Sequence, residues 1–463
     1  MNPISSRKIN KVEITTDTLS SRGGLTFFVK YLESIEIYRV LLEKFSKLKK
    51  NQKGVEVGNL FKQVLCFFFD GTSAHLSYFD ELAADEGYAA VLENEPARMA
   101  SSHTMKRFFK AFGVWSGAAF RWVLQRLWIW RLKLEKPELI VVTVDTMVMD
   151  NDEALKRDGC DPTYKKKKGF QPLQLIWEGK IVDAIFRRGK KHSNYGKQAA
   201  QLLEKNVTLI REHYSWEVPI IVRLDSGFLD EHTSQVLEEL SVGFIATGKI
   251  TDPIKKRIAE IGPRQWKEYD NGRQRWAYAG FRYRCESWEK GQDYRALYTR
   301  PKYEGQQELL EFARPDNIIF TNLEPGTMAW EMLDESQRAQ WLEEETIIES
   351  HHQRGADELP HRGLKDFGGE QLPFKRFAPN RAYYYLMVIS FFLFETFKED
   401  GLEGILPVNA YPTTIRRRLV DLAAKVVCMG HEIILKVGQA AMTRLQLDLL
   451  FKRCCQAPCI LQI

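Results

Sequence analysis

The spacing of apolar residues separates the chain into segments of different periodicity. Residues 25–135 contain apolar stretches at helical spacing, such as LFKQVLCFFF and FRWVLQRLWIW, and few strand signals, which predicts a helical region. From Leu139 onward, LIVVTVD, LQLIWEGKIVDAIFRR and PIIVRLD have the apolar, β-branched character of strands, whereas QAAQLLEKNVTLIREHY and LDEHTSQVLEEL have a helical pattern. A strand, a hairpin and then alternating helices and strands predict an α/β layer with a mixed sheet.

This succession resembles the order of a ribonuclease H-like fold, and we assign residues 136–249 and 341–400 to such a core. Residues 250–340 interrupt it. There RQRWAYAGFRYRCESW and YRALYTRP alternate aromatic and basic residues with period 2, which predicts a β-rich insertion. Residues 401–463 are expected to form a helical C-terminal region, since RRRLVDLAAKVVCMGHEIILKV begins a helical pattern. The expected fold class is an α/β ribonuclease H-like core with a mixed sheet and a β-rich insertion, flanked by helical regions.

One short helix in the N-terminal region combines apolar and basic positions. In MASSHTMKRFFKAF, Ser101 or Ser102 is a candidate N-cap, and Lys106 and Arg107 lie beside apolar residues that a helix would bury. The recognition helix of a helix-turn-helix has this pattern, although any basic amphipathic helix shares it. We expect residues 1–135 to form a helical DNA-binding region that uses Lys106 and Arg107.

Composition and charge narrow the class of protein. With 44% apolar and 12% aromatic residues, the 463-residue chain is suited to well-packed domains. The net charge is +6, and residues 1–135 hold 20 Lys and Arg against 14 Asp and Glu, which favours a partner with phosphates. Seven scattered cysteines form no disulfide framework, the N-terminus has no apolar leader, and the most membrane-like run has 13 residues. These features predict a cytoplasmic protein with no membrane partner.

Two aspartates stand at the ends of predicted buried strands. Asp145 ends VVTVD and Asp225 ends IVRLD, and ligands of α/β sheets bind at the carboxyl ends of strands. Either residue alone is better explained as a cap of the following helix. Both lie in one predicted sheet, however, and Glu358 follows beyond the insertion. Three hard oxygen donors on separate elements can hold one or two Mg²⁺ ions.

Three segments together resemble the motifs of bacterial insertion-sequence transposases of the DDE type. They are VVTVDT, RLDSGF and His351-x2-Arg354-x3-Glu358-x6-Lys365, the last similar to a third motif of the form Tyr-x2-Arg-x3-Glu-x6-Lys. The segments YKKKKGFQP, FRRGKKHSN, SSRGGLTFF and LVDLAAKVVCMGHEIILK are also similar to the branch of these transposases that has an inserted β domain. The resemblance covers most of the chain.

The resemblance implies a role for the charged residues of the three motifs. Asp145, Asp225 and Glu358 would be the catalytic residues and the ligands of two Mg²⁺ ions, for which Mn²⁺ can substitute. Arg354 and Lys365 would hold DNA phosphates beside these ions. Cations next to the carboxylates reduce the electrostatic cost of bringing a polyanion to an acidic site.

The third motif departs from the usual family pattern at one residue and constrains the local helix at another. His351 replaces the usual Tyr, so a phosphate hydrogen bond would come from an imidazole and depend on pH. Pro360 is incompatible with a helix interior. We therefore expect a helix that starts near Ala356, with Pro360 in its first turn and with His351 and Arg354 preceding it.

Basic residues also cluster between the two aspartates. A four-lysine run is most often a solvated loop, but its place beside a phosphodiester site favours contact with DNA. The residues predicted to make this contact are Lys165, Lys166, Lys167, Lys168, Arg187 and Arg188.

The chemistry implied by the resemblance is two-metal phosphoryl transfer on double-stranded DNA. Water as nucleophile would nick the element's end, and the liberated 3′-OH would then join target DNA. The family resemblance implies cleavage at terminal inverted repeats within a synaptic homodimer. Two alternatives remain open: a ribonuclease H-like nuclease without strand transfer, and a DNA-binding or regulatory protein descended from a transposase.

Overall fold

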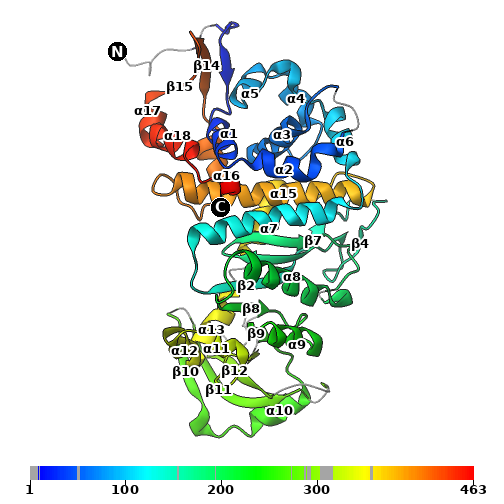
Figure 1. Ribbon diagram of the computed structural model, residues 1–463, viewed down its shortest axis with the longest axis vertical. Coiled ribbons are helices and arrows are strands. Elements are labelled where there is room, and N and C mark those ends of the chain that lie inside the picture. The colour runs from blue at the N-terminus through cyan, green and yellow to red at the C-terminus, as the bar shows by residue number, and fades with distance from the viewer. Residues whose placement is uncertain are drawn as a thin grey trace.

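The computed structural model describes residues 9, 11–49, 53–153, 156–192, 194–272, 274–285, 288, 293–302, 316–354 and 358–462. The molecule is elongated, with helices of the N-terminal region at one end and a large sheet at the other (Figure 1). Two long helices, α7 (Ser116–Glu135) and α15 (Phe377–Phe397), run side by side between these parts. Both ends of the chain lie on the helical side of the molecule.

The helical prediction for residues 25–135 is confirmed over its described part. Besides α7, the helices are α1 (Leu25–Ser34), α2 (Ile37–Phe45), α3 (Val57–Asp70), α4 (Tyr78–Ala84), α5 (Glu86–Val91) and α6 (Ser102–Ala111). The apolar run of α3 packs against α15, which is itself buried along nearly its whole length. This burial explains the uncharged run in α15, and no helix among the described residues is long and apolar enough to cross a membrane.

A nine-stranded mixed sheet forms the other side of the molecule. Its strands, in spatial order, are β10 (Lys267–Asp270), β11 (Arg275–Arg284), β12 (Asp293–Lys302), β13 (Asn317–Thr321), β9 (Gly243–Thr247), β8 (Ile220–Leu224), β2 (Ile140–Thr146), β6 (Leu173–Trp177) and β7 (Lys180–Ile185). The pairs β2–β8 and β8–β9 are parallel, and the other pairs are antiparallel. The expected α/β arrangement with a mixed sheet is confirmed.

Helices of the α/β unit connect or cover these strands. They are α8 (Gln198–His213), α9 (Glu231–Glu239), α10 (Asp252–Ala259), α11 (Met328–Glu331), α12 (Glu335–Leu342), α13 (Glu344–Gln353) and α14 (Glu358–Gly368). The β-rich segment predicted for residues 250–340 does contain strands, and they continue the same sheet outward from β9. Beside the large sheet lies a small one, made of β3 (Met149–Asp150), β5 (Lys168–Phe170) and β4 (Asp161–Pro162).

The C-terminal region, expected to be helical, also contains strands. Residues Ala424–Met429 (β14) and Glu432–Val437 (β15) form a hairpin, and β14 also pairs with β1 (Thr18–Ser20). Each strand of the hairpin contains two adjacent β-branched residues, which favour strands. Gly430 adopts a φ of 65° in the turn between the strands. Helices do flank the hairpin: α16 (Pro412–Ile415), α17 (Gln439–Arg444) and α18 (Leu447–Cys455).

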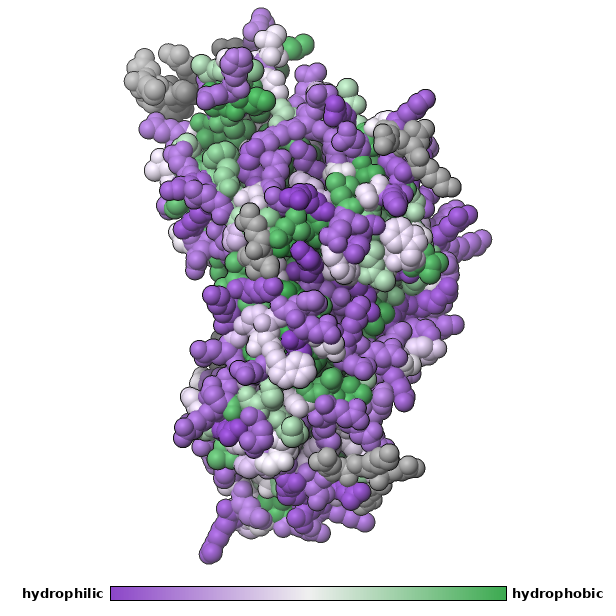
Figure 2. Space-filling model, viewed as in Figure 1, coloured by the Kyte–Doolittle hydropathy of each residue, from purple (hydrophilic) through white to green (hydrophobic). Residues whose placement is uncertain are grey.

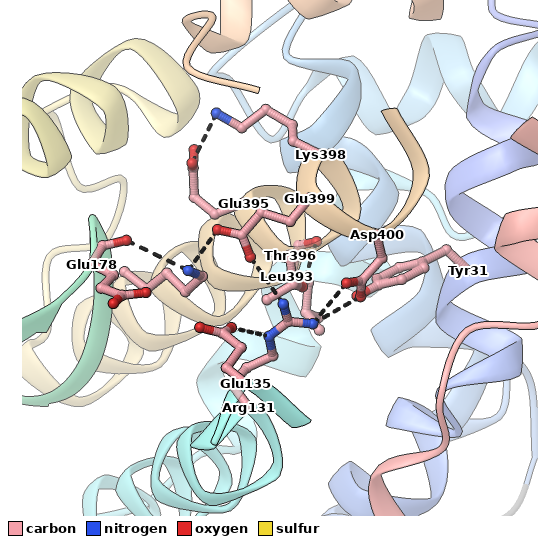
Figure 3. Close-up of polar contacts among 11 residues, drawn as sticks. Tyr31, Arg131, Glu135, Glu178, Leu393, Glu395, Thr396, Lys398, Glu399 and Asp400 are labelled. Carbon is pink, nitrogen blue, oxygen red and sulfur yellow. Dashed lines mark hydrogen bonds and ion pairs between the residues drawn. The ribbon is translucent and has the colours of Figure 1, made fainter. Parts of the chain in front are cut away.

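A buried ionic network joins the helical side to the sheet (Figure 3). Arg131 of α7 donates to Asp400 at 2.8 Å and to Glu399 at 3.1 Å, in the π-helical turn that follows α15. Lys180 of β7 lies 2.6 Å from Glu399, and the Tyr31 hydroxyl of α1 donates to Asp400 at 2.7 Å. The two acidic residues after α15 thus hold α1, α7 and β7 together.

Candidate active site

Asp145 and Asp225 lie at the same end of two neighbouring parallel strands. Val144 of β2 pairs with Leu224 of β8, so the next residue of each strand carries one of the aspartates. Each carboxylate accepts a hydrogen bond from the backbone N–H of the following residue, at 2.7 Å in both cases. Their side chains are 24% and 43% exposed, respectively, so both carboxylates are reachable from solvent.

The third motif approaches both aspartates from the ends of two helices. Arg354, directly after α13, places Nη1 3.5 Å from Oδ1 of Asp225. His361 of α14 places Nδ1 3.8 Å from Oδ2 of Asp145. Glu358 is the first residue of α14, one helical turn before His361. In the sequence it stands between Arg354 and His361, which contact the two aspartates, and its side chain lies outside the described residues.

The expected break in this motif is confirmed. α13 ends at Gln353 and α14 begins at Glu358, with Pro360 in its first turn. Proline is tolerated there because the first N–H groups of a helix have no partner within the helix. His351 and Lys365 therefore lie on two helices, α13 and α14.

The chemistry of the donors fits a hard divalent cation. Asp145 and Asp225 offer carboxylate oxygens at adjacent strand ends, which are the ligands that Mg²⁺ prefers in proteins. Among the described residues, no group of three His, Cys, Asp or Glu side chains is close enough to hold a metal ion. A three-carboxylate centre thus depends on Glu358, as the sequence predicts.

His361 is a site residue that the sequence analysis missed. Its side chain is buried, and burial, together with the charges of Lys365 and Lys165, lowers the pKa of His361 to about 4. At neutral pH an uncharged imidazole therefore faces Asp145. The available sequence signal was its position three residues after Glu358, which places both residues on one face of the helix.

His351 has surroundings different from those expected. It is buried, its Nε2 lies 2.9 Å from Oγ1 of Thr247 at the end of β9, and burial lowers the pKa of His351 to about 3. The imidazole is therefore neutral near pH 7 and ties α13 to β9. A charge-assisted contact with phosphate is not supported for this residue.

Lys165, Lys166 and Lys167 lie in the turn between β4 and β5, and Lys168 is the first residue of β5. All four residues are exposed. The charge of Lys165 contributes to the lowered pKa of His361. Lys167 pairs with Asp150 at 2.5 Å, and Lys365 pairs with Glu370 at 3.0 Å. These are surface pairs, which DNA phosphates can replace at little cost.

The two arginines after β7 differ in exposure. Arg188 is exposed in large part and pairs with Asp158 at 2.7 Å. Arg187 is buried and donates to the carbonyl oxygens of Gln171, at 2.9 Å, and His192, at 3.3 Å. The structure gives Arg187 a role in fixing the loop, and a direct contact with DNA is not supported for it.

The basic helix α6 borders a groove. Ser101 is its N-cap, and Lys106 and Arg107 are exposed. The groove, of about 620 Å³, lies between α6 and the segment before α15. The basic residues lining it are His75, Lys106, Lys110, Lys375 and Arg376. The last two were missed by the sequence analysis, because an isolated Lys-Arg pair before a helix has no specific pattern.

Comparisons with known proteins show the family to which the chain belongs. No curated protein matches the sequence. Among solved structures, the chain is similar to a piggyBac transposase in a cryo-EM synaptic complex with hairpin DNA, with a TM-score of 0.42 and 11% identity. That similarity covers 95% of this chain and 84% of the other. The family described as "Transposase DDE domain group 1" matches residues 1–459, and the chain therefore belongs to this family of DDE transposases.

Proposed function

We propose that this chain is a DNA transposase that cuts at the terminal inverted repeats of its insertion sequence and joins the 3′-OH ends to target DNA. The observation that carries the proposal is the convergence of the three motifs: Arg354 reaches Asp225 and His361 reaches Asp145, on either side of Glu358. The order of elements around the aspartates supports a ribonuclease H-like core.

Asp145, Asp225 and Glu358 would hold two Mg²⁺ ions, or Mn²⁺ in their place. When bound, such ions activate an oxygen nucleophile and stabilise the leaving oxygen at phosphorus. The backbone hydrogen bonds to Asp145 and Asp225 fix the direction of both carboxylates before DNA arrives. Arg354, beside Asp225, is placed to orient a phosphate next to the carboxylates, and its fixed positive charge suits that role.

DNA would leave the site along a track of basic side chains. The track begins at the exposed turn of Lys165 to Lys168 and continues over Arg188. Arg188 pairs with Asp158, whose backbone N–H donates to the carbonyl oxygen of Lys375 at 2.9 Å. Lys375 lines the groove below α6. Phosphate contacts along such a track supply sequence-independent affinity and set the register of the duplex.

The carboxylates favour catalysis over binding alone. A module that only binds DNA has no need for Asp145 and Asp225 beside phosphate, because both repel the polyanion. A nuclease without strand transfer uses the same carboxylates. It differs from a transposase only in whether the 3′-OH is joined to a second duplex.

A joining assay separates these possibilities. The substrate is a labelled duplex of the cognate element end with a pre-cut 3′-OH, incubated with a target plasmid and Mg²⁺. The wild type is expected to join the label to the plasmid. Asp225→Asn, which removes one charge and preserves shape, is expected to bind the end and lose joining by at least about a hundredfold, the scale of a lost general or electrostatic catalytic group.

Asp252→Asn is the matched control, because Asp252 is an exposed residue of α10 with a surface pair to Lys255. It should join as the wild type does. Cleavage of uncut ends without any joining would favour the nuclease, and end binding with neither reaction would favour the binding protein.

A further inference from the structure

β15 forms an open edge of the sheet β1-β14-β15. No described strand pairs with its outer side, although it carries Ile433, Ile434 and Leu435, and the Ile433 side chain is 75% exposed. Beside it lies a groove of about 540 Å³ that Phe27 and Phe451 help to line. Figure 2 shows apolar surface over the β14–β15 hairpin. An exposed apolar edge of this kind is a template for pairing with another strand.

The register of the hairpin tells which backbone groups of β15 face outward. Met429 and Glu432 close a two-residue turn, and such a closing pair exchanges two hydrogen bonds. Hydrogen-bonded pairs alternate along an antiparallel ladder, so Glu432, Ile434 and Lys436 bond to β14. The backbone N–H and C=O groups of Ile433 and Leu435 then point to the open edge.

We propose that two copies of this chain associate through β15, paired antiparallel about a two-fold axis at Ile434. In this register Ile433 is opposite Leu435 of the second copy, and both contribute outward backbone groups to the new ladder. Glu432 is opposite Lys436 of the second copy, twice in the dimer. The register thus satisfies the hydrogen-bonding pattern and the charges together.

The charge pattern of β15 indicates that the strand that pairs with its open edge is the β15 of a second copy. Glu432 and Lys436 stand at equal distances on either side of Ile434 and lie on one face of the strand. Neither makes an ion pair within the part of the chain that the structure describes. Lys425, which is opposite Lys436 in the hairpin, is already paired with Asp17 at 2.7 Å. A strand with this sequence is complementary to itself.

The apolar side chains fit the same arrangement. Paired residues of an antiparallel ladder point to one face, so Ile433 and Leu435 of both copies would form a continuous apolar row. That row would lie on the side of the groove containing Phe451, which is 44% exposed. The pairing extends a three-stranded sheet to six strands and removes its open edge. It concerns the free protein and does not depend on DNA cleavage.

The test is the self-association of the full chain, measured by sedimentation equilibrium without DNA. The wild type is expected to be dimeric at high concentration. Glu432→Lys places Lys opposite Lys twice, and Lys436→Glu places Glu opposite Glu twice. Each change is expected to raise the dimer dissociation constant about tenfold or more, because like charges directly opposite destabilise a ladder.

An equimolar mixture of the two variants is the decisive sample. Each Lys of the first variant then meets a Glu of the second, so the mixture is expected to form a heterodimer as tight as the wild-type dimer. The control is Glu239→Lys, an exposed change on α9 far from the hairpin (Figure 1), which should leave the dimer unchanged.

The remaining outcomes overturn the proposal. A wild type that stays monomeric at all concentrations has no such interface. A dimer that resists both charge variants uses another surface. Variants that dissociate but do not associate when mixed show that Glu432 and Lys436 are not opposite each other. Because both side chains are exposed, thermal unfolding should confirm that each variant folds like the wild type.

Discussion

The candidate active site is built from residues whose positions are set largely by the backbone. Asp145 and Asp225 follow paired residues of two parallel strands, and each is oriented by the N–H of its successor. Arg354 and His361 then approach from two helix ends, one charged and one neutral. A rigid arrangement of this kind suits a reaction in which positioning and electrostatics supply most of the catalysis.

The buried His351 predicts a pH dependence of stability. Its pKa in the folded chain is about 3, below the ordinary value near 6.5, so the unfolded chain binds more protons between these values. Stability is therefore lost as pH falls below about 6.5. When the pH falls from 7 to 5, the free energy of unfolding of the wild type should decrease by about 2 kcal/mol more than that of His351→Gln.

Urea unfolding of both proteins at the two pH values measures this difference. The glutamine can keep a hydrogen bond to Thr247 without gaining a charge, so the comparison isolates the titration of the imidazole. An identical pH dependence in the two proteins would show that His351 is not buried in its neutral form.

At the scale of elements, the ionic network at the end of α15 links parts that are distant in the sequence. Arg131 of α7 donates hydrogen bonds to Glu399 and Asp400. Lys180 of β7 also pairs with Glu399, and the Tyr31 hydroxyl of α1 donates to Asp400. The π-helical turn that carries both acids lies at the junction of the helical side and the sheet (Figure 3). Removing the Arg131 guanidinium would leave Glu399 and Asp400 without one of their hydrogen-bond donors in a largely buried environment.

Arg131→Met is therefore expected to destabilise the fold by about 3–5 kcal/mol, the usual cost of breaking a buried ion pair from one side. Equilibrium denaturation measures the change. Arg257→Met is the control, because Arg257 pairs with Glu260 on the surface of α10 and should cost no more than about 1 kcal/mol. A similar loss in both variants would mean that the network contributes no more than a surface pair.

Elements with a strong local pattern could be predicted from the sequence. The α/β strands, the N-terminal helices, the N-cap of α6 and the break before Pro360 all follow from periodicity or from backbone chemistry. The β14–β15 hairpin could not, because its turn is Gly-His and lacks the usual Asn-Gly signal, and its partner β1 lies some 400 residues earlier in the chain. Propensity alone does not reveal such distant pairing.

Within the candidate active site, residues at strand ends could be predicted from the sequence, whereas the burial of individual side chains could not. Asp145 and Asp225 were found because strand ends have a sequence pattern, whereas burial of Arg187 and His351 depends on which loops and strands cover them. The only sequence signal for His361 was its position three residues after Glu358, and that spacing alone does not identify a site residue. Positions along the chain were predictable, and the surroundings of individual side chains were not.

At the scale of the whole molecule, the two ends of the chain form one unit. β1 pairs with β14 and α1 packs on α18, so the N-terminal and C-terminal regions lie together on the helical side (Figure 1). The proposed pairing edge belongs to this unit, whereas the candidate active site lies at the sheet. The proposed basic track, from Lys165 to α6, would connect the two sides.

The most direct test of this account is Mg²⁺-dependent cleavage of a labelled duplex carrying the cognate element end, comparing the wild type with Glu358→Gln. Glutamine preserves the shape of the side chain and removes its charge, and end binding is measured in parallel. If Glu358 completes the metal site, the wild type cleaves the end, whereas the variant binds the end but no longer cleaves it. Equal cleavage by both proteins, or binding without cleavage by either, would contradict it.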